Sequence, residues 1–395
     1  MASLRDVRES SVRPVPVQHQ IDVAPQSRKR VMTEYLRYRD DLEMISPDEQ
    51  ETVKNLIEVM LKGQHEVRAT SGRSVRISHA KAHGVVAGEL IVHAGLIPEL
   101  RQGLFAQSGS HPVVVRLSQV PGEVLDDRKV SSPRGMALKV FNVAGPKLVG
   151  HQGQMTQDFV LENGKAFFAK DPKAFLSKFT PNAIAAPLLP ESIKGAVSVA
   201  SRVTNAALNA VGLSSDTLDI FGHPHLHPLG ESYYSQAAIR YGDYVAKIGI
   251  TPASETVRTL EGKDVKLDGE NSLRTAVVDF FQSHEARYDV KVQLALDPKT
   301  TPIEDATVPW PEDLTPYRSV ATLVLPVQNA FEPSLQQTVD ETWSFAPGHA
   351  LEAHRPLGSI MRARLKVYPV LSTSRRQENG SPTLEPQSCP GHRPS

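Results

Sequence analysis

The alternation of apolar and polar positions divides the chain into helical and extended stretches. Between residues 47 and 62, apolar side chains recur at helical spacing, at Val53, Leu56, Ile57, Met60 and Leu61. This spacing predicts an amphipathic helix, with Ser46 as its capping residue. From about 74 to 141 the pattern changes to short β-branched runs separated by Gly and Pro, which predict strands of a sheet or barrel. An Ala-rich helical stretch follows from about 164 to 213, and strands resume after it.

The two ends of the chain lack such periodicity. They carry scattered Arg, Ser, Pro and Gln, a composition that does not build a hydrophobic core. We therefore predict a disordered N-terminal arm over 1–35, one folded domain over 36–376 and a disordered C-terminal tail over 377–395. No repeat of fixed period is present in the sequence, which argues against solenoids and propellers.

Composition narrows the function classes. The 44 basic and 44 acidic side chains balance, so no global field favours nucleic acid as a partner. The single cysteine, Cys389, excludes an intramolecular disulfide framework and a cysteine-based metal cluster. The N-terminal residues lack the apolar core of a secretory signal, and no apolar run reaches the length of a transmembrane segment. We expect a cytoplasmic protein.

Two predicted strands carry candidate chemistry. In SVRISHA, alternation puts His79 on the same face as Val75 and Ile77, so the imidazole is expected to point inward. It is either a base in a dry pocket or a satisfied core histidine. In HPVVVRLS, Arg116 and Ser118 share one face. That pair could hold an anion and orient a histidine, or it could belong to an exposed strand face.

A third candidate lies near the C-terminus. In RLKVY, Arg364 and Tyr368 stand at i and i+4, so in a helix the guanidinium lies beside the phenol oxygen. Positive charge near a phenol favours tyrosinate, which is a hard anionic ligand for ferric iron. The same spacing is also common on solvated helices. Pro369 is expected to kink the helix just past the tyrosine.

These residues lie in blocks that resemble a known family. RLKVYP resembles the haem-tyrosine motif of catalases, which reads Arg, Leu, two variable positions, Tyr and Pro. Three further blocks agree with catalases in the same order: RISHAK, the stretch from Val113 to Phe141 that contains VVVRLS and PRGMALKVF, and DATVPWPEDLTPYRSVATLVL from Asp305 to Leu325. Together the blocks span roughly residues 70 to 376, so the resemblance covers most of the chain.

The resemblance implies a fold, a cofactor and a set of site residues. The implied fold is α+β, a catalase-like antiparallel β-barrel with surrounding helices. The implied cofactor is haem b, with its iron held by Tyr368 and with Arg364 as the charge partner of the tyrosine. His79 would be the distal acid and base, oriented by Ser118. The remaining implied contacts to the cofactor are Arg76, Arg116 and Arg375 at the haem propionates, and Phe159 and Phe167 as an aromatic wall.

The chain also departs from the catalase pattern. Catalases carry a distal asparagine in the segment that reads HQGQMTQDFV here, and anchoring that segment on Thr156 and Phe159 places Met155 at the asparagine position. The alternative, in which a local shift brings Gln154 or Gln157 to this position, stays open. The chain stops soon after the tyrosine motif, so it is more similar to the small catalase-related haem proteins than to classical catalases.

The implied function is that of a haem peroxidase or weak catalase acting on hydrogen peroxide or organic hydroperoxides. A role in the oxidative stress response and a homo-oligomeric state follow from the same resemblance. Two alternatives remain: an isomerase or dehydratase of organic (lipid) hydroperoxides, and a non-catalytic haem-binding or sensing protein. A zinc site on His79 and His83 is disfavoured, because four residues of strand separate them by about 13 Å. The run HPHLH, from His223 to His227, is expected to be a loop because prolines interrupt it.

Overall fold

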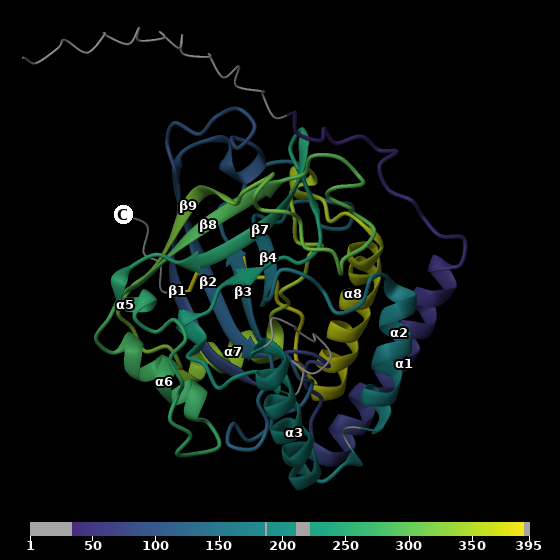
Figure 1. The fold of residues 1–395 in the computed structure, drawn as a ribbon, viewed down its shortest axis with the longest axis vertical. Helices are drawn as coiled ribbons and strands as arrows, with labels where there is room; N and C mark the ends of the chain where they lie inside the picture. The colour runs from purple at the N-terminus through teal and green to yellow at the C-terminus, as the bar shows by residue number, and fades with distance from the viewer. Residues whose placement is uncertain (1–33, 186–187, 211–221, 391–395) are drawn as a thin grey trace, which may run out of the picture. The chain divides into compact units, whose positions relative to one another are not determined.

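Antiparallel strands form the centre of the structure, a computed structural model that describes residues 34–185, 188–210 and 222–390 (Figure 1). The sheet runs in the order β5-β4-β3-β2-β1-β9-β8-β7-β6, and a pairing of β5 with β7 closes it into a barrel. The strands are β1 (Ala82–Val92), β2 (Gly109–Gln119), β3 (Arg134–Val140), β4 (Gln157–Asn163), β5 (Tyr233–Tyr234), β6 (Ile239–Tyr241), β7 (Tyr244–Pro252), β8 (Ala286–Leu294) and β9 (Arg318–Leu325).

Each barrel strand presents an inner face and an outer face, because successive side chains point to opposite sides of a sheet. Leu117 of β2, with Met136 and Leu138 of β3, belongs to the large apolar cluster that fills the barrel. Val114 of β2 belongs instead to a second cluster, together with Trp343 and Cys389. We call the first side the inner face and the second the outer face. Arg116 and Ser118 share the outer face with Val114, as the sequence pattern predicted.

Helices surround the barrel. They are α1 (Glu49–Ser71), α2 (Pro172–Ala185), α3 (Glu191–Ala210), α5 (Glu255–Arg258), α6 (Ser272–Phe281), α7 (Pro333–Thr342) and α8 (Ser359–Asn379), with short 3₁₀ turns at η1 (Gly103–Ala106), η3 (Pro228–Gly230) and η4 (Glu352–His354). Figure 1 shows α1, α2 and α8 side by side on one flank of the barrel. Leu56 and Met60 of α1 pack there against Ala363 and Val367 of α8. The expected α+β architecture of an antiparallel barrel with surrounding helices is confirmed.

The first helix is longer than its apolar pattern indicated. It begins one residue after Asp48, which occupies the N-cap position, while the hydroxyl of Ser46 bonds to the Asp48 carboxylate. It continues past residue 62 to Ser71 because Val67 is still buried. Gly72 ends it in the left-handed conformation, with φ of 79°.

Two other predictions need correction. SVRISHA is not a strand: residues 74–80 form an irregular segment before β1, and His79 has a positive φ of 60°.

At the C-terminal end, α8 continues through Pro369 to Asn379. The residues after it, which the sequence pattern assigned to a tail, contact the barrel: Glu385 pairs with Lys139, and Cys389 is buried. The arm predicted over 1–35 lies almost wholly outside the described residues.

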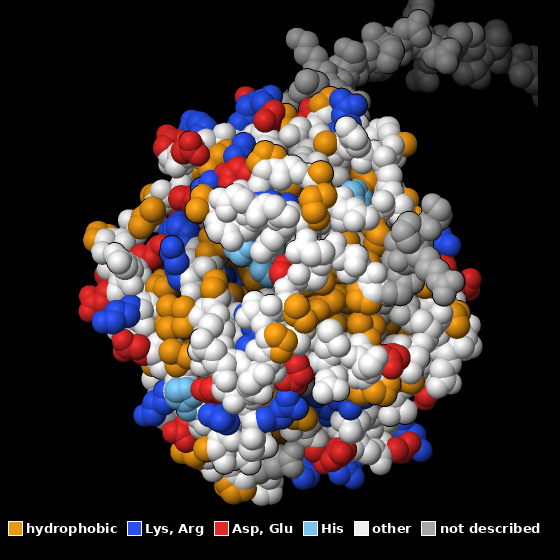
Figure 2. Space-filling view, turned by 180° about the vertical axis from the view of Figure 1, so that it is seen from behind, with side chains coloured by type: hydrophobic (Ala, Val, Ile, Leu, Met, Phe, Trp, Pro, Cys, Tyr) orange, Lys and Arg blue, Asp and Glu red, His pale blue; other side chains and the backbone are white. Residues whose placement is uncertain are grey.

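The surface carries charges of both signs. Figure 2 shows Lys and Arg side chains interspersed with Asp and Glu around one face, with hydrophobic side chains gathered nearer its middle. No one-sign patch is visible there, in keeping with the balanced composition. Among the described residues, no helix is long and apolar enough to cross a membrane.

Candidate active site

One wall of the candidate site is a face of α8. The guanidinium Nη2 of Arg364 donates a hydrogen bond of 2.9 Å to the Tyr368 phenol oxygen, and the guanidinium carbon lies 5.1 Å from the centre of the phenol ring. Helical geometry brings residues at i and i+4 together in this way. Arg375 lies about three turns after Arg364, on the same side of the helix. The helix therefore presents Arg364, Tyr368 and Arg375 as one stripe.

The opposite wall is built around His79. Its backbone N–H donates to the Val120 carbonyl at 2.8 Å, and the next N–H, of Ala80, donates to the Pro121 carbonyl at 3.0 Å. The imidazole Nδ1 lies 3.1 Å from Ser118 Oγ, within hydrogen-bonding distance. Gly135 leaves room for the ring, because a Cβ there would lie 2.5 Å from two of its atoms. Residues from two segments, 118–121 and the start of β3, thus hold His79 in one orientation.

His79 is held neutral. Its pKa is lowered to about 3 by burial and then by the positive charges of Arg116, Arg364 and Arg76. Ile77, two residues before His79, packs with Ala363 and Val367 of α8, so the segment that carries His79 lies against the helix that carries Arg364 and Tyr368. In the tautomer that donates the Nδ1–H to Ser118 Oγ, Nε2 is left as a proton acceptor.

Three arginines converge beside this space, and Asp340 of α7 lies among them. The Asp340 carboxylate oxygen Oδ1 accepts hydrogen bonds of 2.9 Å from both Arg76 and Arg116. Arg375 donates to the Asp340 carbonyl at 2.5 Å. The structure therefore brings Arg76 and Arg116 together with Arg375 of α8.

Asp340 was missed by the sequence reasoning. Burial alone would raise its pKa, but the charges of Arg116 and Arg76 outweigh that effect and hold the pKa below its usual range. Asp340 is thus a carboxylate that offsets part of the positive charge of the arginine cluster. Its place in α7 carries no local signal, because its partners Arg76 and Arg116 lie more than 200 residues away in sequence.

The two phenylalanines lie in different places. Phe159 of β4 is on the inner face: it pairs in register with Leu138, and its ring centre lies 6.3 Å from that of Phe105. The residue of β4 that packs with the outer cluster beside Ala137 is Val160. Phe159 therefore lies on the opposite side of the sheet from Ser118, in contrast to its expected place in a haem wall. Phe167 stacks near Phe175, which packs against the cluster shared by α1 and α8.

The segment before β4 holds the residues considered for the distal amide. Met155 is 39% exposed, and its backbone carbonyl accepts a hydrogen bond from the Val143 N–H. Gln154 bonds to His151, and Gln157 is buried with its side-chain oxygen accepting from the Leu351 N–H. Within the described residues, no hydrogen bond links the side chain of Met155, Gln154 or Gln157 to His79.

A buried ion cluster on the outer face is a second feature that the sequence did not reveal. The Lys139 ammonium donates to Asp158 at 2.8 Å and to Glu385 at 2.6 Å, and it lies 3.2 Å from His349 Nδ1. The two carboxylates and the imidazole are close enough together to hold a metal ion, but the ammonium already lies among them. This cluster attaches the segment after α8 to β3 and β4.

The histidines considered as zinc ligands have other surroundings in the described part of the chain. His83 lies in β1 with neither ring nitrogen hydrogen-bonded, and His79 bonds to Ser118 instead of pairing with it. His223 lies 2.7 Å from Glu231, whereas the N–H of Leu229 donates to the His227 ring. Within the described ranges, these histidines are not part of any group of three metal-binding side chains close to one another.

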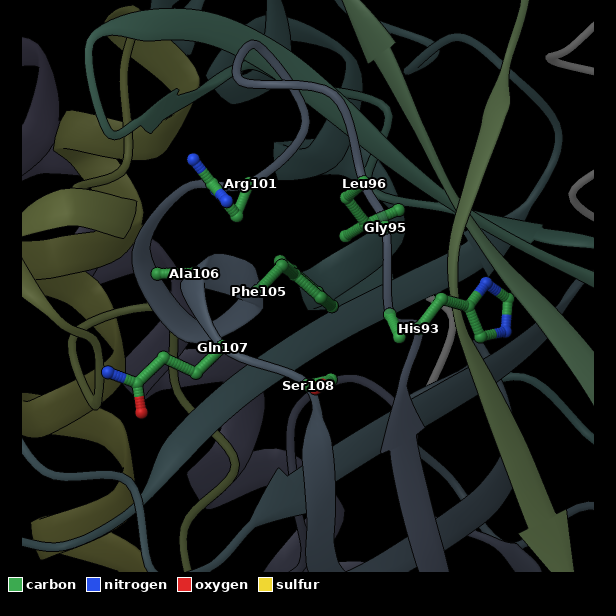
Figure 3. Close-up of a pocket in the computed structure, with 9 residues that line it drawn as sticks. His93, Gly95, Leu96, Arg101, Phe105, Ala106, Gln107 and Ser108 are labelled. Atoms are coloured by element: carbon green, nitrogen blue, oxygen red, sulfur yellow. The ribbon is translucent and has the colours of Figure 1, made fainter.

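A surface pocket of about 400 Å³ lies elsewhere, in the loop that joins β1 to β2. Figure 3 shows Phe105 and Leu96 between the two arms of this loop, with Arg101 and Gln107 towards its outer side. The His93 ring turns away towards β9, where Nε2 lies 2.9 Å from Thr322 Oγ1. None of the residues predicted for the site lines this pocket.

Comparison with solved structures shows the fold. Catalase A from Saccharomyces cerevisiae superposes with a TM-score of 0.53 at 17% identity, covering 77% of this chain and 61% of that one. A fungal catalase gives 0.54 at 19% identity, covering 78% and 60%. A bacterial catalase gives 0.50 at 17% identity, covering 77% and 58%. The chain thus spans about 60% of the length of these catalases. No protein-family model and no curated protein matches the sequence. The expected catalase-like fold is confirmed.

Proposed function

We propose that this protein is a haem-dependent oxidoreductase that acts on hydrogen peroxide or organic hydroperoxides. One observation carries the proposal. In a catalase-like fold, the helix that carries the hydrogen-bonded Arg364–Tyr368 pair packs against the segment that carries His79, whose imidazole lies within hydrogen-bonding distance of Ser118. We infer that Tyr368 is the iron ligand and that His79 acts as acid and base beside the bound peroxide.

The residues present fit haem b. Tyr368 would offer its phenol oxygen to the iron, and Arg364, which donates a hydrogen bond to that oxygen, would compensate the negative charge of the bound tyrosinate. Arg76, Arg116 and Arg375 would bind the propionates, since guanidinium groups pair with carboxylates. Phe167 would contribute an apolar wall. Bound haem would supply the iron at which the peroxide O–O bond is broken.

His79 would move the proton. Because burial and three nearby arginines hold its pKa at about 3, the imidazole is neutral at physiological pH. Its Nε2 can take a proton from one peroxide oxygen and return it to the other as the bond between them breaks. Ser118 positions the ring through Nδ1. His79 is thus the acid and base of the proposed reaction, and Ser118 is a positioning residue.

The outer face of β4 favours a peroxidase or weak catalase, or an enzyme for organic hydroperoxides, over an efficient catalase. The side chains that β4 places on this face are Asp158, Val160 and Glu162, and Asp158 is bound to Lys139 and His349. None of the three is an amide, and the thioether of Met155 has no hydrogen to donate. Peroxide would be less well oriented for the oxygen-evolving half of a catalase cycle.

The test is the absorption spectrum and iron content of the purified full-length protein. We expect one haem per chain with a tyrosine-ligated spectrum, modest oxygen evolution from hydrogen peroxide, and oxidation of a small reductant. Conversion of a lipid hydroperoxide without added reductant would identify an isomerase or dehydratase. Haem binding without turnover would identify a binding or sensing protein. Failure to bind haem would overturn the proposal. The same preparation would test the proposed homo-oligomeric state.

A further inference from the structure

A second set of polar side chains lies inside the barrel, on the far side of β2 from the candidate site. Gln119 is two residues beyond Leu117 and shares its inner face, whereas Ser118 points outward to His79. Arg134 of β3 is the register partner of Gln119 and shares the inner face with Met136. Gln119 and Arg134 are both almost completely buried, at 1% and 0% exposure.

His83 of β1 completes the row. Ala82 pairs with Ser118 and Gly84 pairs with Leu117, so His83 is the extra residue of a β-bulge. It is fully buried, and its pKa is lowered well below the usual value by burial and then by the charge of Arg134. Gly84 pairs with Leu117, and the Gln119 N–H donates to the Lys81 carbonyl, so His83 lies on the neighbouring strand beside Gln119. A neutral imidazole offers one N–H donor and one acceptor nitrogen.

A carboxylate lies beyond Arg134. The backbone N–H of Arg134 donates to Asn163 Oδ1 at 2.6 Å, and Asn163 Nδ2 donates to Glu231 Oε1 at 2.9 Å. The same oxygen of Glu231 lies 2.7 Å from His223 Nε2. Its second carboxylate oxygen, Oε2, is buried without a partner among the described protein atoms.

Six buried polar atoms of these four residues have no protein partner among the described residues: both ring nitrogens of His83, both side-chain amide atoms of Gln119, Nε of Arg134 and Oε2 of Glu231. Native proteins satisfy nearly all such atoms, because leaving them bare costs free energy. The set contains donors and acceptors together, since the amide and guanidinium donate while the carboxylate accepts. Its occupant must therefore do both, and it must be small enough to lie between barrel strands.

We propose that the inner end of the barrel holds a buried water site among His83, Gln119, Arg134 and Glu231. Water is neutral, donates twice and accepts twice, and bridges buried polar groups of this kind. The site is distinct from the space between His79 and Tyr368, because the β2 backbone separates Ser118 from Gln119. The water site requires no haem, so it can be tested independently of the proposed function.

A crystal structure of the unchanged protein at better than about 2 Å resolution tests the site directly. We expect separate peaks of water density within hydrogen-bonding distance of Gln119, His83 and the Arg134 Nε. Side chains that close on one another with no density between them would overturn the proposal. Continuous density for a larger solute, or density for an ion, would also overturn it, because the occupant would then not be water.

Thermal unfolding gives a second, independent test. Gln119→Leu removes the amide while nearly preserving volume, so a hydrated site predicts a melting temperature lower by roughly 1–3 °C, since waters would lose their partners. A dry site predicts a higher melting temperature, because an unsatisfied buried amide would be removed. Gln293→Leu is the matched control: that buried amide donates to the carbonyls of Trp310 and Thr315, so its loss lowers the melting temperature in either case. A rise for Gln119→Leu alongside a fall for the control would rule out the water site.

Discussion

The two walls of the candidate site are held in different ways. On α8, Arg364 and Tyr368 lie one helical turn apart, and a single 2.9 Å hydrogen bond within the helix positions them. On the barrel side, His79 sits in an irregular segment with a positive φ, and its position depends on Val120, Ser118 and Gly135. The helical wall is locally determined, whereas the barrel wall is assembled from distant segments.

This difference predicts different responses to mutation. A substitution on α8 changes the chemistry offered at one atom and leaves the helix in place. A substitution around His79 changes its geometry, even when the substituted residue has no chemistry of its own. The two walls can therefore be disturbed separately, with haem retention reporting on one and turnover on the other.

The largest effect is expected from Tyr368→Phe, which removes the only protein oxygen proposed to bind the iron. We expect the variant to lose haem during purification, measured as iron content and as the Soret absorbance relative to protein. Tyr234→Phe, in β5, is the matched control and should retain haem. An unchanged spectrum in Tyr368→Phe would remove the ligand assignment.

His79→Ala should spare haem binding and affect turnover. The loss of a positioned acid and base typically costs roughly two to four orders of magnitude, which we expect in the rate of peroxide consumption. The Soret absorbance should remain near that of the unchanged protein. His284→Ala, at an exposed position, serves as the control. Full activity in His79→Ala would exclude His79 from the mechanism.

The helical wall could be predicted from sequence, and the barrel wall only in part. The i, i+4 spacing of Arg364 and Tyr368 is a local property that survives in any helix. The face shared by Arg116 and Ser118 was predicted for the same reason, since β2 is a regular strand. His79 was placed on a strand that does not form, because its φ of 60° depends on backbone hydrogen bonds to residues 120 and 121. No periodicity in SVRISHA encodes those partners.

A smaller effect should follow from Gly135→Ala, which tests whether geometry alone controls the barrel wall. A Cβ at this position would lie 2.5 Å from the His79 ring and 3.1 Å from Ser118 Oγ, so the imidazole must move. We expect peroxide turnover to fall by about tenfold or more with haem content unchanged. Gly109→Ala, at the start of β2 where a Cβ meets nothing within 4 Å, should have no effect. Equal activities in the two variants would contradict the proposed positioning of His79.

Asp340 and Phe159 show a further limit of sequence reasoning. Asp340 belongs to the site only because α7 packs where Arg76, Arg116 and Arg375 converge. Phe159 was assigned to the haem wall by alignment, but the register of β4 with β3 places Val160 on the outer face instead. Both outcomes depend on tertiary packing and strand register, which local patterns do not determine.

Asp340→Asn tests the carboxylate that pairs with two of the clustered arginines. Removing its charge leaves Arg76 and Arg116 without their carboxylate partner, while the bond from Arg375 to the Asp340 carbonyl remains. This should lower the stability of the haem-free protein by about 1–3 kcal/mol, given that Asp340 is partly exposed. The measurement is urea unfolding, with Asp41→Asn, in the exposed pair with Arg39, as a control expected to change little. Because haem propionates would supply new carboxylates, added haem should recover part of the loss. A variant as stable as the control would contradict the role of Asp340.

The smallest expected effect is that of pH on peroxide turnover, because His79, the proposed acid and base, should stay neutral over the range tested. An ordinary histidine with a pKa near 6.5 would be about 3% neutral at pH 5, so a base of that kind would lose roughly thirtyfold of its activity between high pH and pH 5. The pKa of His79 is lowered to about 3 by burial and by Arg116, Arg364 and Arg76, so its neutral form persists down to about pH 3.

The same pKa shift makes the stability of the fold depend on pH. The unfolded chain takes up a proton near pH 6.5 and the folded chain does not, so acidification below about pH 6.5 favours unfolding. We therefore expect peroxide turnover to be nearly flat between pH 8 and pH 5 while the melting temperature falls over the acidic part of that range. Turnover should be measured well below the melting temperature, with circular dichroism as a check on folding. A thirtyfold loss of turnover in protein that remains folded would show that the barrel wall does not hold His79 in its neutral form.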